Sequence, residues 1–178
     1  QGGSIVRIDA GGTESDFRAA DNRARLVGAK VDADRRRLWV CAQGVDDTDN
    51  RVWVYDLNTA QLELEFLLGA LATNGSCNDL ALDSNGVAYV TDPENPFLYR
   101  LDPATETGSV LATDPLFNDI TGAGLGLNGI AVTPDESALI VAKFAPASLL
   151  RVDLPAADSV AVVALSGAAL PSPDGIVF

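Results

Sequence analysis

The sequence predicts an all-β protein, a β-propeller of four-stranded blades, from two interleaved repeats and the short strands between them. An apolar-x-x-apolar-Asp phrase occurs as "IVRID", "VWVYD", "LYRLD" and "LLRVD", ending at Asp9, Asp56, Asp102 and Asp153. A second phrase occurs as "VGAKVD" from Val27, "NDLALD" from Asn78, "NGIAVT" from Asn128 and "DGIVF" from Asp174. Both phrases return after 46 to 51 residues. Repeats of about 40–50 residues that hold four short strands indicate propeller blades.

The segments between the repeats complete each blade. "RLWVC", "VAYVTD" and "ALIVAK" are short and rich in β-branched or aromatic residues, and turn sequences such as "DSNG" and "TPDES" separate the strands. The single domain 1–178 then divides into three full blades with parts of two others. The predicted pieces are outer strands of a first blade over 1–20, full blades over 26–68, 78–112 and 128–165, and the first strand of a further blade over 174–178.

Two interpretations of this strand count are open. The chain is either about four blades' worth of a larger propeller or a four-bladed ring that lacks one strand. The first interpretation needs no special assumption and is preferred. It predicts that the open blade edges are covered by further blades, by self-association or by a partner chain, because unpaired edges promote association.

Composition limits the classes of function. With 12 basic and 25 acidic residues the formal net charge is −13, which disfavours nucleic acid as a partner. No apolar run is long enough to span a bilayer. The chain has no His, which excludes Ser-His-Asp and Cys-His catalysis and His metal ligands. Chemistry is therefore expected from carboxylates, amides, Lys, Tyr or a hard metal ion with oxygen ligands.

Four positions are expected to meet at one end of the central channel. They are the first residues of the second phrase: Val27, Asn78, Asn128 and Asp174. Innermost strands surround the axis of a propeller, so amide and carboxylate oxygens from different blades would converge there, as Ca²⁺ and similar ions require. The alternative is that Asn and Asp here simply form turns that lead into strands. We call these four the axial positions.

Three of these motifs, in this order and spacing, resemble the gluconolactonase and senescence-marker-protein (regucalcin-like) family. They are "CNDLALDSNGVAYVTD", "LNGIAVTPDESALIVA" and "PSPDGIVF", and the resemblance covers roughly 26–178. It implies a six-bladed propeller in which Asn128 is a metal ligand and Asp174 is a metal ligand and general base. Asn78 would orient the substrate or a bound water. The family's metal site also contains a Glu from the first blade, which has no counterpart in this sequence.

The resemblance implies a divalent-metal-dependent hydrolase that acts on lactones or similar small esters. The implied cofactor is Ca²⁺, with Zn²⁺, Mn²⁺ or Mg²⁺ as alternatives, and the substrate is a small molecule. The alternative function is a non-catalytic extracellular propeller that serves as a binding or assembly module. The acidic composition favours a secreted or extracellular protein over a cytoplasmic one.

The two cysteines are expected on the same face of the ring. Cys41 ends the second strand of one blade, and Cys77 directly precedes the first strand of the next. In an extracellular protein they would form a disulfide that joins adjacent blades beside Asn78. Two buried free thiols are the alternative.

Overall fold

The computed structural model describes residues 3–20, 23–45, 49–119, 121–122, 125–168 and 170–178. In these ranges the chain forms three four-stranded antiparallel sheets and one two-stranded sheet. We call the two-stranded sheet the N-terminal hairpin and the others blades I, II and III in chain order. The all-β prediction is confirmed.

Each sheet is a meander, so its strands pair in the order of the sequence. The N-terminal hairpin consists of β1 (Ile5–Ile8) and β2 (Glu14–Arg18). Blade I consists of β3 (Ala24–Asp32), β4 (Arg37–Gly44), β5 (Arg51–Asp56) and β6 (Leu62–Leu67). Blade II consists of β7 (Leu80–Leu82), β8 (Ala88–Thr91), β9 (Phe97–Asp102) and β10 (Thr107–Thr113). Blade III consists of β11 (Leu127–Val132), β12 (Ala138–Lys143), β13 (Ser148–Asp153) and β14 (Val160–Val162).

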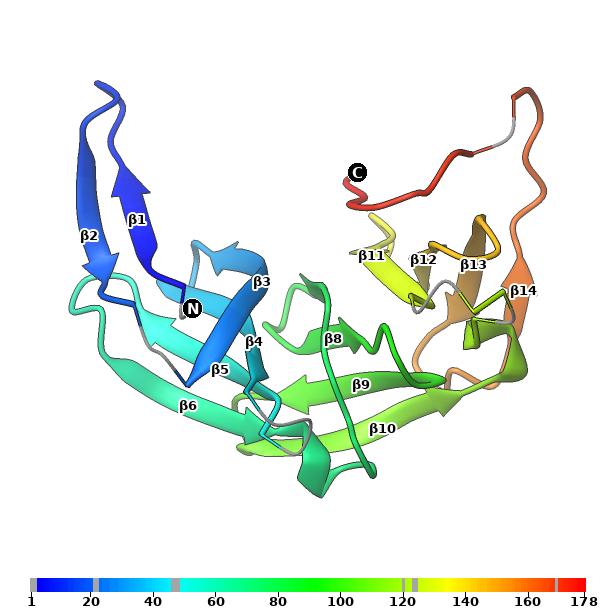
Figure 1. Cartoon of the computed structure of the whole chain (residues 1–178), viewed down its shortest axis with the longest axis horizontal. Helices are drawn as coiled ribbons and strands as arrows, with labels where there is room; N and C mark the ends of the chain where they lie inside the picture. Colours follow the sequence, from blue (N-terminus) through cyan, green and yellow to red (C-terminus); the bar gives the residue numbers. More distant parts are fainter. Residues whose placement is uncertain (1–2, 21–22, 46–48, 120, 123–124, 169) are drawn as a thin grey trace.

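The sheets follow one another along an open arc, with the N-terminal hairpin at one end and blade III at the other (Figure 1). The first strands of the three blades, β3, β7 and β11, contact one another in sequence order. They are therefore the inner strands that face the axis. A strand was predicted over 174–178, but the structure assigns none there. A strand requires a hydrogen-bonded partner strand, and no described segment pairs with these residues.

Adjacent blades bury their facing surfaces in separate hydrophobic clusters. One cluster joins blades I and II through side chains such as Trp39 and Tyr99, and another joins blades II and III through side chains such as Leu98 and Leu139. A third cluster lies between the N-terminal hairpin and blade I, where Phe17 packs edge-on against Tyr55. Blade II is covered on both faces, and all four residues of its strand β8 are buried.

The Asp of the first repeat closes the turn between the third and fourth strands of a blade. Asp56 accepts hydrogen bonds from the backbone N–H groups of Asn58 and Thr59, and Asp102 accepts one from Ala104. Asp9 plays the same part in the N-terminal hairpin. These backbone hydrogen bonds hold the pKa values of the three carboxyl groups below the ordinary value. Turn formation therefore explains the Asp in three copies of the repeat. In the fourth copy the Asp153 carboxylate instead accepts a hydrogen bond from the Arg151 side chain over 2.7 Å.

Candidate functional site

The inner strands of blades I and III carry a β-bulge at the same place. In β3 the pairing with β4 shifts between Leu26 and Ala29, and in β11 the pairing with β12 shifts between Leu127 and Ile130. The residues inside these shifts are a Val-Gly pair and an Asn-Gly pair, each beginning at an axial position. A bulge bends its strand and aims a side chain in a new direction. The fold therefore uses an irregularity to orient Asn128.

The glycine of each bulge lets the next segment along the arc approach closely. The Gly28 N–H donates to the Asn78 carbonyl over 2.8 Å. A Cβ atom at Gly28 would lie 2.4 Å from that oxygen, and one at Gly129 would lie 2.1 Å from the Asp174 carbonyl oxygen. A side-chain carbon cannot come so near a carbonyl oxygen, so these contacts require glycine. Each glycine thus sets one axial position beside the next.

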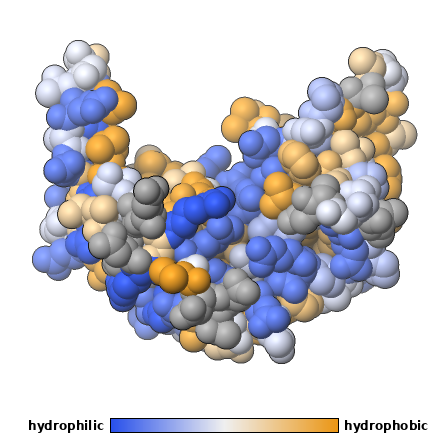
Figure 2. Space-filling model, in the orientation of Figure 1, coloured by the Kyte–Doolittle hydropathy of each residue, from blue (hydrophilic) through white to orange (hydrophobic). Residues whose placement is uncertain are grey.

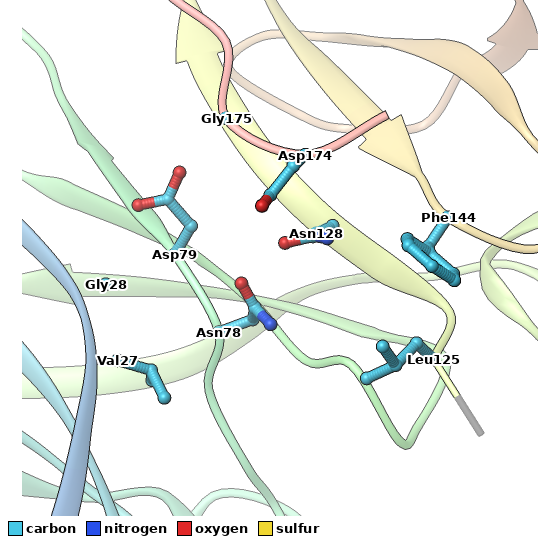
Figure 3. A pocket seen from close by; sticks show the side chains of 9 residues that line it. All are labelled: Val27, Gly28, Asn78, Asp79, Leu125, Asn128, Phe144, Asp174 and Gly175. Atoms are coloured by element: carbon cyan, nitrogen blue, oxygen red, sulfur yellow. The ribbon is translucent and has the colours of Figure 1, made fainter. Parts of the chain in front are cut away.

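The four axial positions line one cavity of about 540 Å³. Its other lining residues are Gly28, Asp79, Leu125, Phe144 and Gly175. The side-chain oxygen atoms of Asn78, Asn128 and Asp174 point toward a common space within it (Figure 3). The structure therefore brings together the axial residues named from the sequence, while their chemical roles stay predictions.

One polar atom of Asn128 lacks a hydrogen-bond partner among the residues that the structure describes. The residue is only 6% exposed, and its Oδ1 atom is buried without a hydrogen-bond partner in the described part of the chain. A buried carbonyl oxygen left without a partner lowers stability by about 1–3 kcal/mol. Such atoms are rare in native proteins and call for an explanation, such as a ligand that binds there. In Figure 3 Oδ1 points into the cavity, where a hydrogen-bond donor or a cation would satisfy it.

Asp79 is a cavity residue that the sequence reasoning did not select. Its Oδ1 atom accepts the Leu80 N–H over 2.8 Å. Burial raises the pKa of Asp79 above the ordinary value, and the nearby Asp174 charge acts in the same direction, while backbone hydrogen bonds and Lys30 oppose the shift. The sequence contained a signal that could have identified Asp79. The residue after each axial position is Gly in every copy of the repeat except that of blade II, where it is Asp79.

Thr91, the last residue of β8, joins the backbones of two cavity-lining residues. Its Oγ1 atom donates to the Asn128 carbonyl over 2.6 Å and accepts the Asp79 N–H over 3.1 Å. The Thr91 N–H also donates to the Asp79 carbonyl over 3.0 Å. The Thr91 side chain is completely buried. It therefore fixes the backbone positions of a blade II residue and a blade III residue at once.

The cavity lining carries oxygen atoms of the kind that hard cations bind. Among the described residues, no group of three or more His, Cys, Asp or Glu side chains lies together as a metal cluster. The cavity instead offers the amide oxygens of Asn78 and Asn128 and the carboxylate of Asp174, with Asp79 beside them. Ca²⁺ takes about six to eight oxygen ligands, including Asn carbonyls. This donor set, with the unpartnered Asn128 oxygen, fits such an ion.

The two cysteines lie next to one another between blades I and II, within one hydrophobic cluster. Both are free thiols in this structure and neither is exposed. Burial raises the pKa of the Cys41 thiol well above the ordinary value, and the adjacent Cys77 thiol acts in the same direction. The Gln43 side chain donates to the Cys77 carbonyl over 2.9 Å. The disulfide between Cys41 and Cys77 stays a prediction.

We expect oxidative folding to link Cys41 to Cys77. In the folded protein the buried thiols should react little with a thiol reagent, because the thiolate is the reactive form and burial disfavours it. Refolding with a mixture of oxidised and reduced glutathione should give a product lighter by two hydrogen atoms in intact-mass measurements. The Cys41→Ser variant should show no such loss. Two titratable thiols in the refolded, denatured wild-type protein would contradict the pairing.

No protein-family model matches this chain, and no curated protein matches it. Several solved structures superimpose on it. A gluconolactonase from Xanthomonas campestris superimposes with a TM-score of 0.70 at 21% identity, over 98% of this chain and 59% of that one. A chain of a nidogen/laminin complex gives a TM-score of 0.70 at 15% identity, over 96% of this chain and 62% of that one.

A catalytically inactive virginiamycin B lyase from Staphylococcus aureus, crystallised with quinupristin, gives a TM-score of 0.67 at 14% identity. The match covers 93% of this chain and 50% of the lyase. These neighbours are propeller proteins. This chain has a β-propeller fold. It spans between half and about three-fifths of the length of these three structures, and at such identities the similarity concerns the fold alone.

In the described part of the chain, no helix is long and apolar enough to cross a bilayer.

Proposed function

We propose that this propeller hydrolyses lactones or similar small esters at the cavity, with a divalent cation held there. The observation that carries the proposal is the convergence of the Asn78, Asn128 and Asp174 oxygens, with Asn128 Oδ1 buried and unpartnered among the described residues. The family resemblance of the three inner-strand motifs and the fold similarity to a gluconolactonase support the same function. Substrate, metal and activity are proposals for this chain.

In this proposal the residues of the chain hold the cation and position the reactants. Asn128 and Asp174 would be its ligands, and Ca²⁺ suits their oxygen atoms best. A cation bound there would supply Lewis-acid polarisation of the carbonyl to be attacked. Asn78 directs an amide oxygen into the same space, where it would orient the substrate or an attacking water. Thr91 keeps the Asn128 backbone in place through its hydroxyl group.

Two carboxylates are candidates for the general base that takes the proton from the attacking water. The sequence resemblance assigns this role to Asp174. Asp79 is the second candidate, because it lines the same cavity and its pKa is raised by burial. A carboxylate with a raised pKa is a stronger base at neutral pH. We therefore expect Asp79→Asn to reduce hydrolysis more than it reduces cation binding.

Calorimetric titration with Ca²⁺ and Zn²⁺ tests the proposal. We expect stoichiometric binding by the wild-type protein, and a loss of affinity of at least about 10-fold in Asn128→Ala and Asp174→Asn, since each removes an oxygen ligand. Affinity should also fall as the pH is lowered through the raised pKa of Asp79, because protonation removes a negative charge beside the site. Hydrolysis of a panel of lactones is the assay that follows.

Asp158→Asn is the matched control, because it removes the same charge from an exposed residue outside the cavity lining. It should bind the cation like the wild-type protein. Equal binding by the wild-type protein, Asp174→Asn and Asn128→Ala would leave the axial residues as turn formers and would contradict the cation site.

A second function, as a binding or assembly module, is favoured by apolar surface at the end of the arc. Val6 and Ile8 of β1 are 49% and 61% exposed. Figure 2 shows hydrophobic surface along the β1 side of the N-terminal hairpin, which faces the gap of the arc in Figure 1. Strand edges of this kind promote association. Light scattering of the purified chain tests this function, and a strict monomer across the micromolar range would argue against assembly.

A further inference from the structure

The cavity has an apolar wall as well as its set of oxygen atoms. Leu125 and Phe144 lie together at one end of the lining, and Asp79 lies at the other end (Figure 3). The side-chain oxygens of Asn128 and Asp174 lie between these two ends. A ligand whose carbonyl group meets the amide and carboxylate oxygens through a cation would therefore direct its remaining atoms to a phenyl ring and a leucine side chain.

The backbone holds this apolar wall in a defined position. The Phe144 N–H donates to the Gly126 carbonyl over 2.8 Å, and the Gly126 N–H donates to the Pro93 carbonyl over 2.7 Å. A Cβ atom at Gly126 would lie 2.7 Å from the Phe117 carbonyl oxygen, so this backbone packs closely against its neighbour. Leu125 directly precedes Gly126. The two apolar side chains thus come from segments fixed to one another, and binding need not order them first.

The rest of the lining offers few donors for a hydroxylated ligand. Among the lining residues that the structure describes, none carries a side-chain hydroxyl, ammonium or guanidinium group. The remaining polar side chains are those of Asn78, Asp79, Asn128 and Asp174. The proposed cation and the carbonyl group would engage the oxygen atoms of Asn78, Asn128 and Asp174, which leaves two amide NH₂ groups and the Asp79 carboxylate for the hydroxyl groups of a ligand. Each hydroxyl of a sugar lactone that enters without a new partner reduces affinity. An alkyl or aryl group gains affinity by leaving water for the apolar wall.

We propose that the cavity selects lactones or esters that carry an alkyl or aryl group over polyhydroxylated sugar lactones. This inference rests on the proposed function for the reacting group and adds the class of substrate. A volume of about 540 Å³ is within the range of small-molecule sites. Phe144 is the specificity-determining residue, because its ring is the largest apolar group in the lining.

Two lactams test this selection without the complication of hydrolysis. Gluconic δ-lactam represents the sugar lactones, and a δ-lactam with a pentyl chain at the ring carbon next to nitrogen represents the alkyl lactones. We expect the alkyl lactam to bind at least about 10-fold more tightly in calorimetric titrations, because only its chain buries apolar surface. Phe144→Ser should lower the affinity for the alkyl lactam about 10-fold and leave that for the sugar lactam unchanged.

Val162→Ser is the matched control, since Val162 is an exposed apolar residue of the outer strand β14, outside the cavity lining. It should bind both lactams like the wild-type protein, and circular dichroism checks that each variant folds. The inference is overturned if the sugar lactam binds as tightly as the alkyl lactam, if neither binds, or if Phe144→Ser leaves the alkyl lactam unaffected.

Titrations with Ca²⁺ and with EGTA separate this inference from the proposed function. If the protein bound no Ca²⁺ but Phe144→Ser still weakened binding of the alkyl lactam, the metal-dependent hydrolase would be contradicted and the apolar selectivity supported. Ca²⁺ binding that Asp174→Asn abolishes, together with a preference for the sugar lactam, would support the cation site and overturn the selectivity.

Discussion

Gly28→Ala should destabilise the protein by about 2–3 kcal/mol, because the new methyl group has no room. Its Cβ atom would lie 2.4 Å from the Asn78 carbonyl oxygen and 2.7 Å from the Asp79 Cα atom. Both are backbone atoms at the entry of blade II, so relief requires the inner strands of two blades to separate. The Gly28–Asn78 backbone hydrogen bond would be lost as well. Urea unfolding of both proteins measures the change.

Gly175→Ala provides the control for this substitution. Gly175 also follows an axial residue, but no described atom lies within 4 Å of the place that its Cβ would take. The same change in backbone freedom should therefore leave the unfolding midpoint nearly unchanged. If Gly28→Ala were as stable as Gly175→Ala, the close contact between β3 and the entry of blade II would not exist in solution.

The cavity should respond to Gly28→Ala along with the stability. The clashing atoms belong to Asn78 and Asp79, whose side chains both line the cavity. A displaced blade II entry would move the Asn78 oxygen away from those of Asn128 and Asp174. We therefore expect weaker cation binding in the folded variant. Gly175→Ala is a control for stability alone, because Gly175 itself lines the cavity.

The architecture was predictable because it depends on features that repeat. Apolar strands, turn residues and the Asp at the end of each third strand recur with the period of the blade, and each has a local physical cause. Asp56 and Asp102 close their turns with their own side chains. The axial positions could be aligned for the same reason, since equal offsets along equivalent blades lead to equivalent places around an axis.

Features that differ between blades were not predictable from the repeat. The bulges in β3 and β11 are departures from regular pairing, and periodicity reports only the regular part of a strand. Asp79 was missed because reasoning from repeats favours shared residues, whereas Asp79 is where one copy differs. The strand expected over 174–178 needed a partner segment, which its own alternating sequence cannot supply.

Asp92→Asn should destabilise the protein by about 2–4 kcal/mol, because it leaves buried donors without an acceptor. Asp92 is completely buried. Its Oδ2 atom accepts the Ser76 N–H over 2.9 Å and the Tyr99 hydroxyl over 2.8 Å. Its Oδ1 atom accepts the N–H groups of Glu94 and Asn95 over 3.0 and 2.9 Å. An amide has one carbonyl oxygen, so its NH₂ group would face the Ser76 N–H if it turned one way and the N–H groups of Glu94 and Asn95 if it turned the other way.

Tyr99→Phe and Asp102→Asn bracket this result in urea unfolding experiments. Tyr99→Phe removes one donor and keeps the carboxylate, so we expect a loss of about 1 kcal/mol. Asp102→Asn makes the same chemical change at a turn next to solvent and should cost less than Asp92→Asn. An Asp92→Asn variant as stable as Asp102→Asn would show that the buried carboxylate does not organise blade II.

Because Ser76 lies two residues before Asn78, the hydrogen bonds that stabilise this blade also fix the segment that carries Asn78 to the cavity. Loss of stability and weaker cation binding are therefore expected together in Asp92→Asn.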